Sequence, residues 1–261
     1  ADVVAGRSLA AALAAADAGP DDPLRAFLLA DNVEFDAGGA LDQLDAAAWD
    51  DDEQLPGDDV ILPGGYAALV AHVAAGLDVR HGEVLQRLDR RPDGVTLTTT
   101  RGTYVADRCV CALPLGVLQT DTVAFSPPLP SAITAAMAAL GVGDVNKVAL
   151  RFPTRFWPVD VQHFGFAPPG GAAFPYLLNT ATFAPDANIL VAVAVGHHGA
   201  AMQARSDDAN VAEVMTMLRT MFGPDVPAPT ASVVTGWTRD PFTRGCYSYA
   251  KVAARSADLG A

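Results

Sequence analysis

The segment Trp-Thr-Arg-Asp-Pro-Phe-Thr-Arg-Gly-Cys-Tyr-Ser-Tyr, from Trp237 to Tyr249, is the most unusual stretch of this sequence. It follows a β-branched run at 231–235, which predicts a strand, and it turns at Asp240-Pro241. A core strand favours Val and Ile, and a surface loop rarely contains so many aromatic rings together with a cysteine. The segment is therefore either the aromatic edge of a core or the wall of a site for a flat molecule.

The composition describes a globular protein with a sizeable core. The chain has 261 residues, of which 51% are hydrophobic, and this length fits one large domain or two modest ones. The formal net charge of −13 argues against a nucleic-acid partner, because phosphate binding needs clustered Lys and Arg. No apolar run is long enough to span a membrane, and residues 1–4 do not resemble a signal peptide, so we expect a cytoplasmic protein without a membrane partner. The sequence does not determine the oligomeric state.

The cysteines and histidines do not indicate a disulfide framework or a metal site. Three cysteines are an odd number, and the five histidines match no zinc-ligand spacing. Cys109 and Cys111 lie two residues apart in a strand-like run, so they share one face, and we expect both to be buried.

Local patterns predict helices and then strands in the first half of the chain. Helices are expected at 8–16 and 23–30, separated by Gly19-Pro20, and a further helix begins near Leu62. The apolar residues of that further helix follow a helical period and predict a stripe that faces a core; they are Tyr66, Leu69, Val70 and Val73. Three short runs then predict a β-meander at 84–88, 95–99 and 108–113.

The second half contains a strand that separates polar from apolar residues. In the run 145–152, Val148, Leu150 and Phe152 alternate onto one face, which places Lys147 on the other. The continuous apolar run 189–195 predicts a buried central strand. A helix that begins at Ser206 or Asp207 should end at Gly223.

Four motifs occur in the order and spacing of one known family. They are Leu113-Pro114-Leu115-Gly116-Val117-Leu118, Pro127-Pro128-Leu129-Pro130, Asn146-Lys147-Val148 leading to Phe156-Trp157, and the segment 237–249. Over residues 30–250 the sequence resembles the flavin-dependent amine oxidases, which comprise the monoamine oxidases, the polyamine oxidases and the flavin histone-lysine demethylases. The resemblance implies an α+β (mixed α/β) fold, in which a mixed β-sheet flanked by helices forms a substrate domain and a β-meander belongs to the FAD-binding domain.

The resemblance also implies a domain organisation. Residues 1–58 would form the helical part of the substrate domain, 59–117 the inner piece of the FAD-binding domain, 118–250 the sheet and helices of the substrate domain, and 251–261 a tail. The Gly-x-Gly-x-x-Gly turn that holds the FAD pyrophosphate in this family is not found, because Gly141-Val142-Gly143 follows a predicted helix. We therefore expect an internal fragment that lacks the N-terminal and C-terminal FAD segments and does not retain FAD firmly.

Several residues match functional positions of the family. Lys147 would be the catalytic lysine that holds a water near the flavin N5, although a lone lysine is more often a surface residue. Trp237 would lie close to both flavin and substrate, and Tyr247 would form one wall of an aromatic cage; Tyr249 is a weaker match that could belong to the core. Leu85 would contact the adenosine end of FAD through its backbone.

Cys246 has two interpretations. Gly245-Cys246-Tyr247 matches the monoamine oxidases, in which this cysteine is joined covalently to the flavin. The other interpretation is a small buried thiol without a link to the cofactor.

The function implied by the resemblance is oxidation of a small-molecule amine. The full-length protein would transfer a hydride from the amine to FAD, giving an imine, and O2 would reoxidise the flavin to give H2O2, whereas the fragment alone would be inactive. Two alternatives remain, a non-catalytic scaffold and another flavin oxidoreductase of desaturase or porphyrinogen-oxidase type. The sequence does not identify the amine. The acidic run 50–53 could attract a polyamine, but a solvated loop is the simpler interpretation.

Overall fold

The computed structural model describes residues 6–16, 22–51, 56–57, 60–62 and 64–254. Residues 1–4, Gly19-Pro20, most of 251–261 and half of the acidic run 50–53 therefore lie outside the described residues. The described helices are α1 (Leu9–Ala15), α2 (Pro23–Leu29), η1 (Ala30–Glu34), α3 (Phe35–Ala37), α4 (Tyr66–Val73), α5 (Leu115–Leu118), α6 (Ser131–Ala139), η2 (Thr180–Thr182), α7 (Gly196–Met202) and α8 (Asp207–Phe222). No described helix combines the length and the apolar character that crossing a membrane requires.

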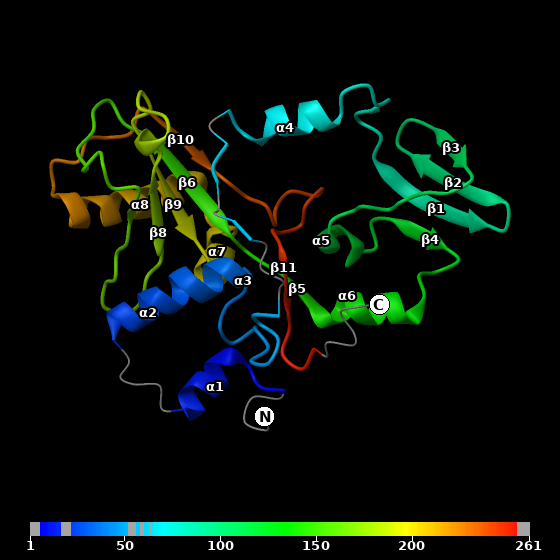
Figure 1. Cartoon of the computed structure of the whole chain (residues 1–261), viewed down its shortest axis with the longest axis horizontal. Helices are drawn as coiled ribbons and strands as arrows, with labels where there is room; N and C mark the ends of the chain where they lie inside the picture. The colour runs from blue at the N-terminus through cyan, green and yellow to red at the C-terminus, as the bar shows by residue number, and fades with distance from the viewer. Residues whose placement is uncertain (1–5, 17–21, 52–55, 58–59, 63, 255–261) are drawn as a thin grey trace.

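A five-stranded antiparallel sheet forms the larger half of the molecule (Figure 1). Its strand order is β10-β6-β9-β8-β7, so β9 is central, as the apolar run 189–195 predicted. The bounds of these strands are β6 (Asn146–Arg151), β7 (His163–Phe164), β8 (Tyr176–Asn179), β9 (Ile189–Ala194) and β10 (Ala231–Val234).

The main core lies between one face of this sheet and α8. Val148 and Leu150 of β6 are completely buried there, which confirms the predicted alternation of that strand. α8 contributes Val214, Met215 and Leu218, and it begins at Ser206, whose side chain accepts a hydrogen bond from the Ala209 N–H. Lys147 of β6 therefore lies on the opposite face of the sheet.

A four-stranded mixed sheet forms the other half of the molecule, in the order β3-β2-β1-β4. Its strands are β1 (Leu85–Arg91), β2 (Gly94–Thr99), β3 (Thr103–Ala106) and β4 (Ala124–Ser126), and β4 runs parallel to β1. The meander is therefore confirmed, and the mixed α/β character of the fold with it. β4 follows residue 117, where we expected the FAD-binding piece to end, and yet it pairs with β1.

The third strand of the meander is not where the sequence predicted it. The strand is β3 at Thr103–Ala106, whereas 108–113 forms no strand and is largely exposed. Cys109 and Cys111 are both exposed, so the prediction that they are buried is wrong. β3 follows β2 after a short turn and pairs with it. The edge of β2 is thereby occupied, and the apolar run 108–113 has no partner strand there.

Helix α4 exposes the stripe that the sequence assigned to a core. Tyr66, Leu69, Val70 and Val73 are 46% to 68% exposed, and no residue of the helix is buried. In Figure 1 the helix lies apart from both sheets, at the edge of the molecule. The period of the apolar residues correctly predicted the helix, but the prediction that its apolar stripe faces a core is wrong.

A two-stranded sheet connects the two halves. β5 (Leu140–Val142) and β11 (Ser248–Ala250) pair antiparallel, so the end of the segment 237–249 lies against the residues that precede β6. The helical segment α2, η1 and α3 is continuous and packs close to the Lys147 side of the five-stranded sheet (Figure 1). This arrangement brings the N-terminal and C-terminal parts of the chain together beside β6.

Candidate functional site

Lys147 is exposed on β6, on the face opposite the main core. Its neighbour Asn146 is completely buried and donates a side-chain hydrogen bond to the Gly199 carbonyl at 2.9 Å. The Lys147 N–H donates to the Thr235 hydroxyl at 2.7 Å, and the Thr235 N–H donates back to the Lys147 carbonyl. Thr235 thus holds both backbone groups of Lys147, while the Lys147 side chain lies outside the core.

The strand register places Lys147 in a row with two residues of neighbouring strands. Lys147 is paired with Val193 of β9, and Val193 is paired with Tyr176 of β8. Directly paired residues of antiparallel strands have their side chains on the same face. Lys147, Val193 and Tyr176 therefore line one face of the sheet.

The helical segment around η1 covers part of this face. Ala30 and Phe35 pack in a small cluster with Val193 and Tyr176, and the rings of Phe35 and Tyr176 have a centroid distance of 5.2 Å. η1 is a π-helix, a rare form that often occurs at functional sites. This π-helix directly precedes Phe35 in the chain.

Cys246 packs against the start of β6. Its N–H donates to the Gly143 carbonyl at 2.9 Å, and its thiol donates to the Val145 carbonyl at 3.1 Å. Burial raises the pKa of the Cys246 thiol, and the Lys147 charge only partly offsets this increase. These contacts favour a packed thiol over a thiolate nucleophile.

Tyr247 connects the C-terminal segment with the helical segment. Its hydroxyl donates to the Phe35 carbonyl, and burial raises its pKa, although the residue as a whole remains 43% exposed. Its ring lies against Gly38, where a Cβ would be 2.6 Å from the ring. Only glycine fits at Gly38, because the φ there is also +77°.

Trp237 lies close in the chain fold to Tyr247. The Gly245 N–H donates to the Trp237 carbonyl at 3.1 Å, which closes the loop between them, and the Trp237 side chain is 42% exposed. Thr235, two residues before Trp237, is hydrogen-bonded to the Lys147 backbone, and the Cys246 thiol donates to the Val145 carbonyl, so both ends of the segment 237–246 lie beside the start of β6.

Two other residues named from the sequence lie outside this group. Tyr249 packs in a different cluster, with Leu9, Val33 and Leu44, and its ring lies so close to Gly141 that a Cβ there would be 2.2 Å away. This position favours the core interpretation of Tyr249.

Leu85 lines a separate cavity of about 590 Å³. The walls of this cavity are mostly apolar and include Val84, Leu113 and Val117, together with Phe242 from the segment 237–249. The one segment therefore contributes to both the Lys147 group and the Leu85 cavity.

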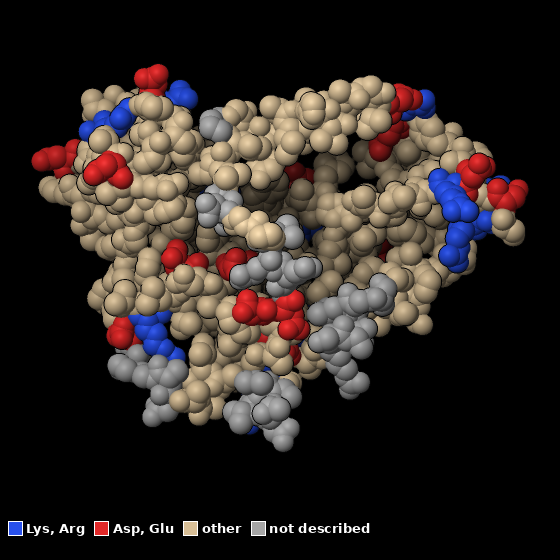
Figure 2. Space-filling view, in the orientation of Figure 1, with Lys and Arg blue, Asp and Glu red and all other residues tan. Residues whose placement is uncertain are grey.

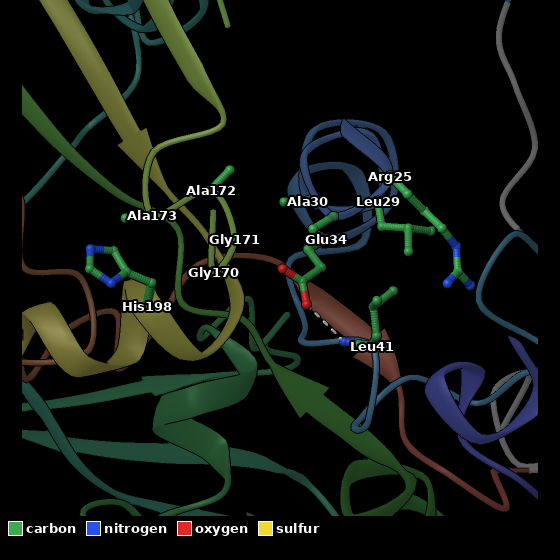
Figure 3. A pocket seen from close by; sticks show the side chains of 11 residues that line it. Arg25, Leu29, Ala30, Glu34, Leu41, Gly170, Gly171, Ala172, Ala173 and His198 are labelled. Atoms are coloured by element: carbon green, nitrogen blue, oxygen red, sulfur yellow. Dashed lines mark hydrogen bonds between the residues drawn. The ribbon is translucent and has the colours of Figure 1, made fainter. Parts of the chain in front are cut away.

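A further pocket, of about 450 Å³, is lined by residues of α2 and η1 and of the loop 170–173 (Figure 3). Arg25 and Glu34 project from the helical segment, and His198 lies beyond the loop 170–173. Glu34 accepts a hydrogen bond from the Leu41 N–H at 3.0 Å; burial raises its pKa, and this hydrogen bond and His197 oppose the increase. The pocket is not part of the Lys147 group.

The sequence did not single out three residues next to the row of Lys147. The Tyr176 hydroxyl and the His163 Nε2 form a hydrogen bond; burial raises the pKa of Tyr176, to which the Asp31 charge adds, and burial raises the pKa of Asp31, which His163 opposes. No local pattern marks these residues, because they come from three separate segments. Among the described residues, no group of His, Cys, Asp and Glu could hold a metal ion.

The charge on the surface is dispersed. Figure 2 shows Asp and Glu side chains scattered over the face that it draws, and on that face the Lys and Arg side chains form small groups next to acidic ones. This distribution agrees with the acidic composition.

Comparisons with known proteins give one consistent result. Residues 18–261 match the model of a family described as flavin containing amine oxidoreductase. Polyamine oxidase 4 of Oryza sativa subsp. japonica is 37% identical over 223 residues, which cover 84% of this chain and 45% of that protein. Lysine-specific histone demethylase 2 of Homo sapiens is 34% identical over 230 residues, which cover 84% of this chain and 28% of that protein. The chain thus spans less than half the length of these relatives.

Solved structures show the same fold at lower identity. Wild-type putrescine oxidase bound to putrescine superposes with a TM-score of 0.76 over 96% of this chain and 58% of that chain, at 18% identity. Cyclohexylamine oxidase from Brevibacterium oxydans IH-35A superposes with a TM-score of 0.68 over 99% of this chain and 63% of that chain, at 16% identity.

Proposed function

Because the chain belongs to the flavin containing amine oxidoreductase family, we propose that it forms the amine-binding wall of an FAD-dependent amine oxidase. One observation carries this proposal. Lys147 is exposed on the face of the sheet opposite the core, its backbone is hydrogen-bonded to Thr235 just before Trp237, and the same segment returns to Val145 through Cys246, next to Tyr247. A cation next to exposed aromatic rings is suited to a site for a flat cofactor and a small amine.

The residues of this chain would divide the work as follows. The Lys147 ammonium group has three donors on a flexible stem, so it can hold a water molecule at the reacting carbon and nitrogen. Trp237 and Tyr247 would bound the space and exclude bulk water, and the Tyr247 ring is held in place by its hydrogen bond to Phe35. The chemistry that FAD supplies when bound is acceptance of a hydride from the amine, which leaves an imine, and transfer of the electrons to O2 to give H2O2.

The described residues fit such a cofactor in two places. The exposed rings beside Lys147 could contact a flat ring system, and the apolar cavity at Leu85 could take a second flat group. We accordingly propose that 59–117, joined by β4, belongs to the FAD-binding part and that 1–58 and the rest of 118–250 belong to the substrate-binding part. We also propose that Cys246 forms no covalent bond to FAD, since its thiol is engaged with Val145.

A screen for peroxide release tests the proposal. The full-length, flavin-loaded protein is offered a panel of alkyl amines, arylalkyl amines and polyamines, and H2O2 is measured with a coupled peroxidase assay. We expect amine-dependent peroxide with at least one class of amine. If dithionite reduces the flavin but none of the amines does, the protein is not an amine oxidase and the proposal fails.

A further inference from the structure

The hydroxyl of Thr235 joins the strand that carries Lys147 to the aromatic segment. β10 ends at Val234, and Thr235 is the first residue after it. A hydrogen-bonded pair in an antiparallel ladder exchanges two main-chain bonds. Thr235 and Lys147 form one of these bonds, from the Thr235 N–H to the Lys147 carbonyl at 2.9 Å. For the other, the Lys147 N–H donates to the Thr235 hydroxyl oxygen at 2.7 Å, so a side chain takes the place of a main-chain acceptor.

This change of acceptor marks the point at which the chain leaves the sheet. Because the Thr235 hydroxyl completes the ladder, the Thr235 carbonyl is not needed there, and the following residues can turn away from β6. Trp237 comes two residues later. An apolar side chain at position 235 would leave the Lys147 N–H to water, whereas a serine would still provide an acceptor.

A second threonine holds the other side of Trp237. The Thr238 hydroxyl donates to the Asp144 carboxylate. Thr235 and Thr238 therefore flank Trp237 in sequence, and both are hydrogen-bonded to residues of the segment 144–147. The backbone of Trp237 is thus held against the start of β6 from both sides.

Asn146 connects the Thr235 hydroxyl to the buried side of the strand. Asn146 is completely buried, and its side chain donates to the Gly199 carbonyl at 2.9 Å. The Thr235 hydroxyl has two acceptors at 3.5 Å, the Asn146 Oδ1 and the Lys147 carbonyl. Both acceptors belong to β6, so the strand that Thr235 supports also holds the Thr235 side chain.

We propose that Thr235 is a positioning residue of the amine site. Its hydroxyl fixes the Lys147 backbone and the point at which the segment 237–249 leaves the sheet, and it thereby sets how far the Lys147 amino group lies from the Trp237 ring. Thr235 acts through these two residues and not by touching the amine. The inference rests on the proposed function, because it takes the amine to be oxidised beside Lys147.

Hydrogen exchange tests the hydrogen bond without any oxidation. Thr235→Val keeps the shape of the side chain but removes the acceptor, so in the full-length protein we expect the Lys147 amide to exchange about tenfold faster. Thr235→Ser should keep the protection of the wild type. Mass spectrometry with fragmentation to single residues measures the exchange. An unchanged rate in Thr235→Val would overturn the inference.

Thr230→Val is the matched control for this experiment. Thr230 flanks the other end of β10, and its hydroxyl donates to the Arg151 carbonyl at 3.2 Å. The substitution therefore removes a hydroxyl from the same strand pair at a distance from Lys147. It should leave the exchange of the Lys147 amide unchanged.

Kinetics of the full-length, flavin-loaded protein test whether Thr235 acts through Lys147. We expect Thr235→Val to lower kcat about tenfold with less than about a twofold change in KM, and Thr235→Ser and Thr230→Val to match the wild type. When Lys147 is already replaced by Met, Thr235→Val should change kcat less than about twofold, because the lysine that it positions is absent. A tenfold loss that persists without Lys147 would refute the positioning role.

The two measurements separate this inference from the proposed function. If amines are oxidised and Thr235→Val keeps the kcat of the wild type, the inference fails and the proposed function stands. If no amine is oxidised, the proposed function fails, and the exchange of the Lys147 amide alone decides whether the Thr235 hydroxyl holds the strand. If Thr235→Val does not fold, Thr235→Ala replaces it in both measurements, since it also lacks the hydroxyl and has a smaller side chain.

Discussion

The hydroxyl of Tyr247 donates a hydrogen bond to the main-chain carbonyl of Phe35. This bond joins the aromatic segment near the C-terminus to the helical segment near the N-terminus, which are 212 residues apart in sequence. Because the Phe35 ring packs on Tyr176, the bond also ties the aromatic segment to the face of the sheet that carries Lys147. The wall of the site is thus built from two segments that depend on each other.

Replacing the lysine should stop amine oxidation and leave the fold intact. We expect Lys147→Met to lower kcat/KM for the best amine at least about 100-fold, the scale of a lost proton-transfer or water-positioning group. Oxygen consumption measures the rate, and the absorbance spectrum checks that flavin is still bound. Arg151→Met is the matched control, because Arg151 is exposed on the same strand and the same face. Full activity in Lys147→Met would favour another flavin oxidoreductase of this fold.

The glycine under Tyr247 should be sensitive to a single added carbon. In Gly38→Ala, the Cβ would be 2.6 Å from the Tyr247 ring and the φ of +77° would be strained, so we expect a loss of about 2 to 4 kcal/mol in the free energy of unfolding. Gly76→Ala is the control, since its φ is +81° but no atom lies within 4 Å of the added Cβ. It should lose only about 1 to 2 kcal/mol. Urea denaturation measures both free energies of unfolding. Equal losses in the two variants would show that the contact of the added Cβ with the Tyr247 ring does not destabilise the protein.

The three thiols should react at two different rates. Cys109 and Cys111 are exposed, whereas Cys246 is half-buried and burial raises its pKa, so its thiolate is scarce at neutral pH. With an aromatic disulfide reagent we expect two fast thiols and one slow one, and the slow rate should increase as the pH rises toward the raised pKa. In Cys246→Ser the slow phase should be missing.

The same cysteine decides the question of a covalent flavin. Acid precipitation of the flavin-loaded protein should release the flavin into the supernatant for the wild type and for Cys246→Ser alike. Flavin that stays in the wild-type precipitate but not in that of Cys246→Ser would contradict our proposal and establish a covalent link.

The stability of the protein should depend on pH through Glu34. Burial raises its pKa above 4.5, so the folded state binds this proton more tightly than the unfolded state does. Its contribution to stability is complete below the unfolded pKa and is lost as the pH rises through the folded pKa. Glu34→Gln cannot ionise and can still accept the Leu41 hydrogen bond, so its Tm relative to the wild type should increase between about pH 4 and about pH 7.

A second carboxylate provides the opposite sign as a control. The hydrogen bond from the Thr99 hydroxyl lowers the pKa of Glu83, so its contribution is present above the unfolded pKa and is lost as the pH falls. The Tm of Glu83→Gln relative to the wild type should therefore decrease over the same rise in pH. Parallel changes in both variants would mean that neither carboxylate causes them.

Local sequence patterns predicted the parts of the fold that depend on local structure. The alternation in β6 correctly placed Val148 and Leu150 in the core and Lys147 on the opposite face, because side chains in a strand alternate without regard to its partners. The period of α8 and its cap at Ser206 were predicted for the same reason. The sequence could not predict which of two apolar runs pairs with β2, because pairing is a long-range property.

The candidate site was predicted only where a motif marks it. Lys147, Trp237, Cys246 and Tyr247 belong to motifs, and the segment that contains the last three is hydrogen-bonded to the start of β6 near Lys147, while their roles stay predictions. Tyr249 belongs to the same motif, but it lies in β11 and is paired with Gly141 of β5, so its ring packs in another cluster. Phe35 and Tyr176 are brought together by packing of the helical segment on the sheet, and no spacing in the sequence encodes that contact.

Helix α4 has a consequence for local unfolding. It is eight residues long, and none of them is buried, so its own hydrogen bonds are almost all that hold it. Isolated helices of this length are marginal in water, and its amides should therefore exchange with deuterium before those of β9. Any surface that comes to cover Tyr66, Leu69, Val70 and Val73 would slow this exchange. The amides of α4 thus act as a natural sensor for whatever binds there.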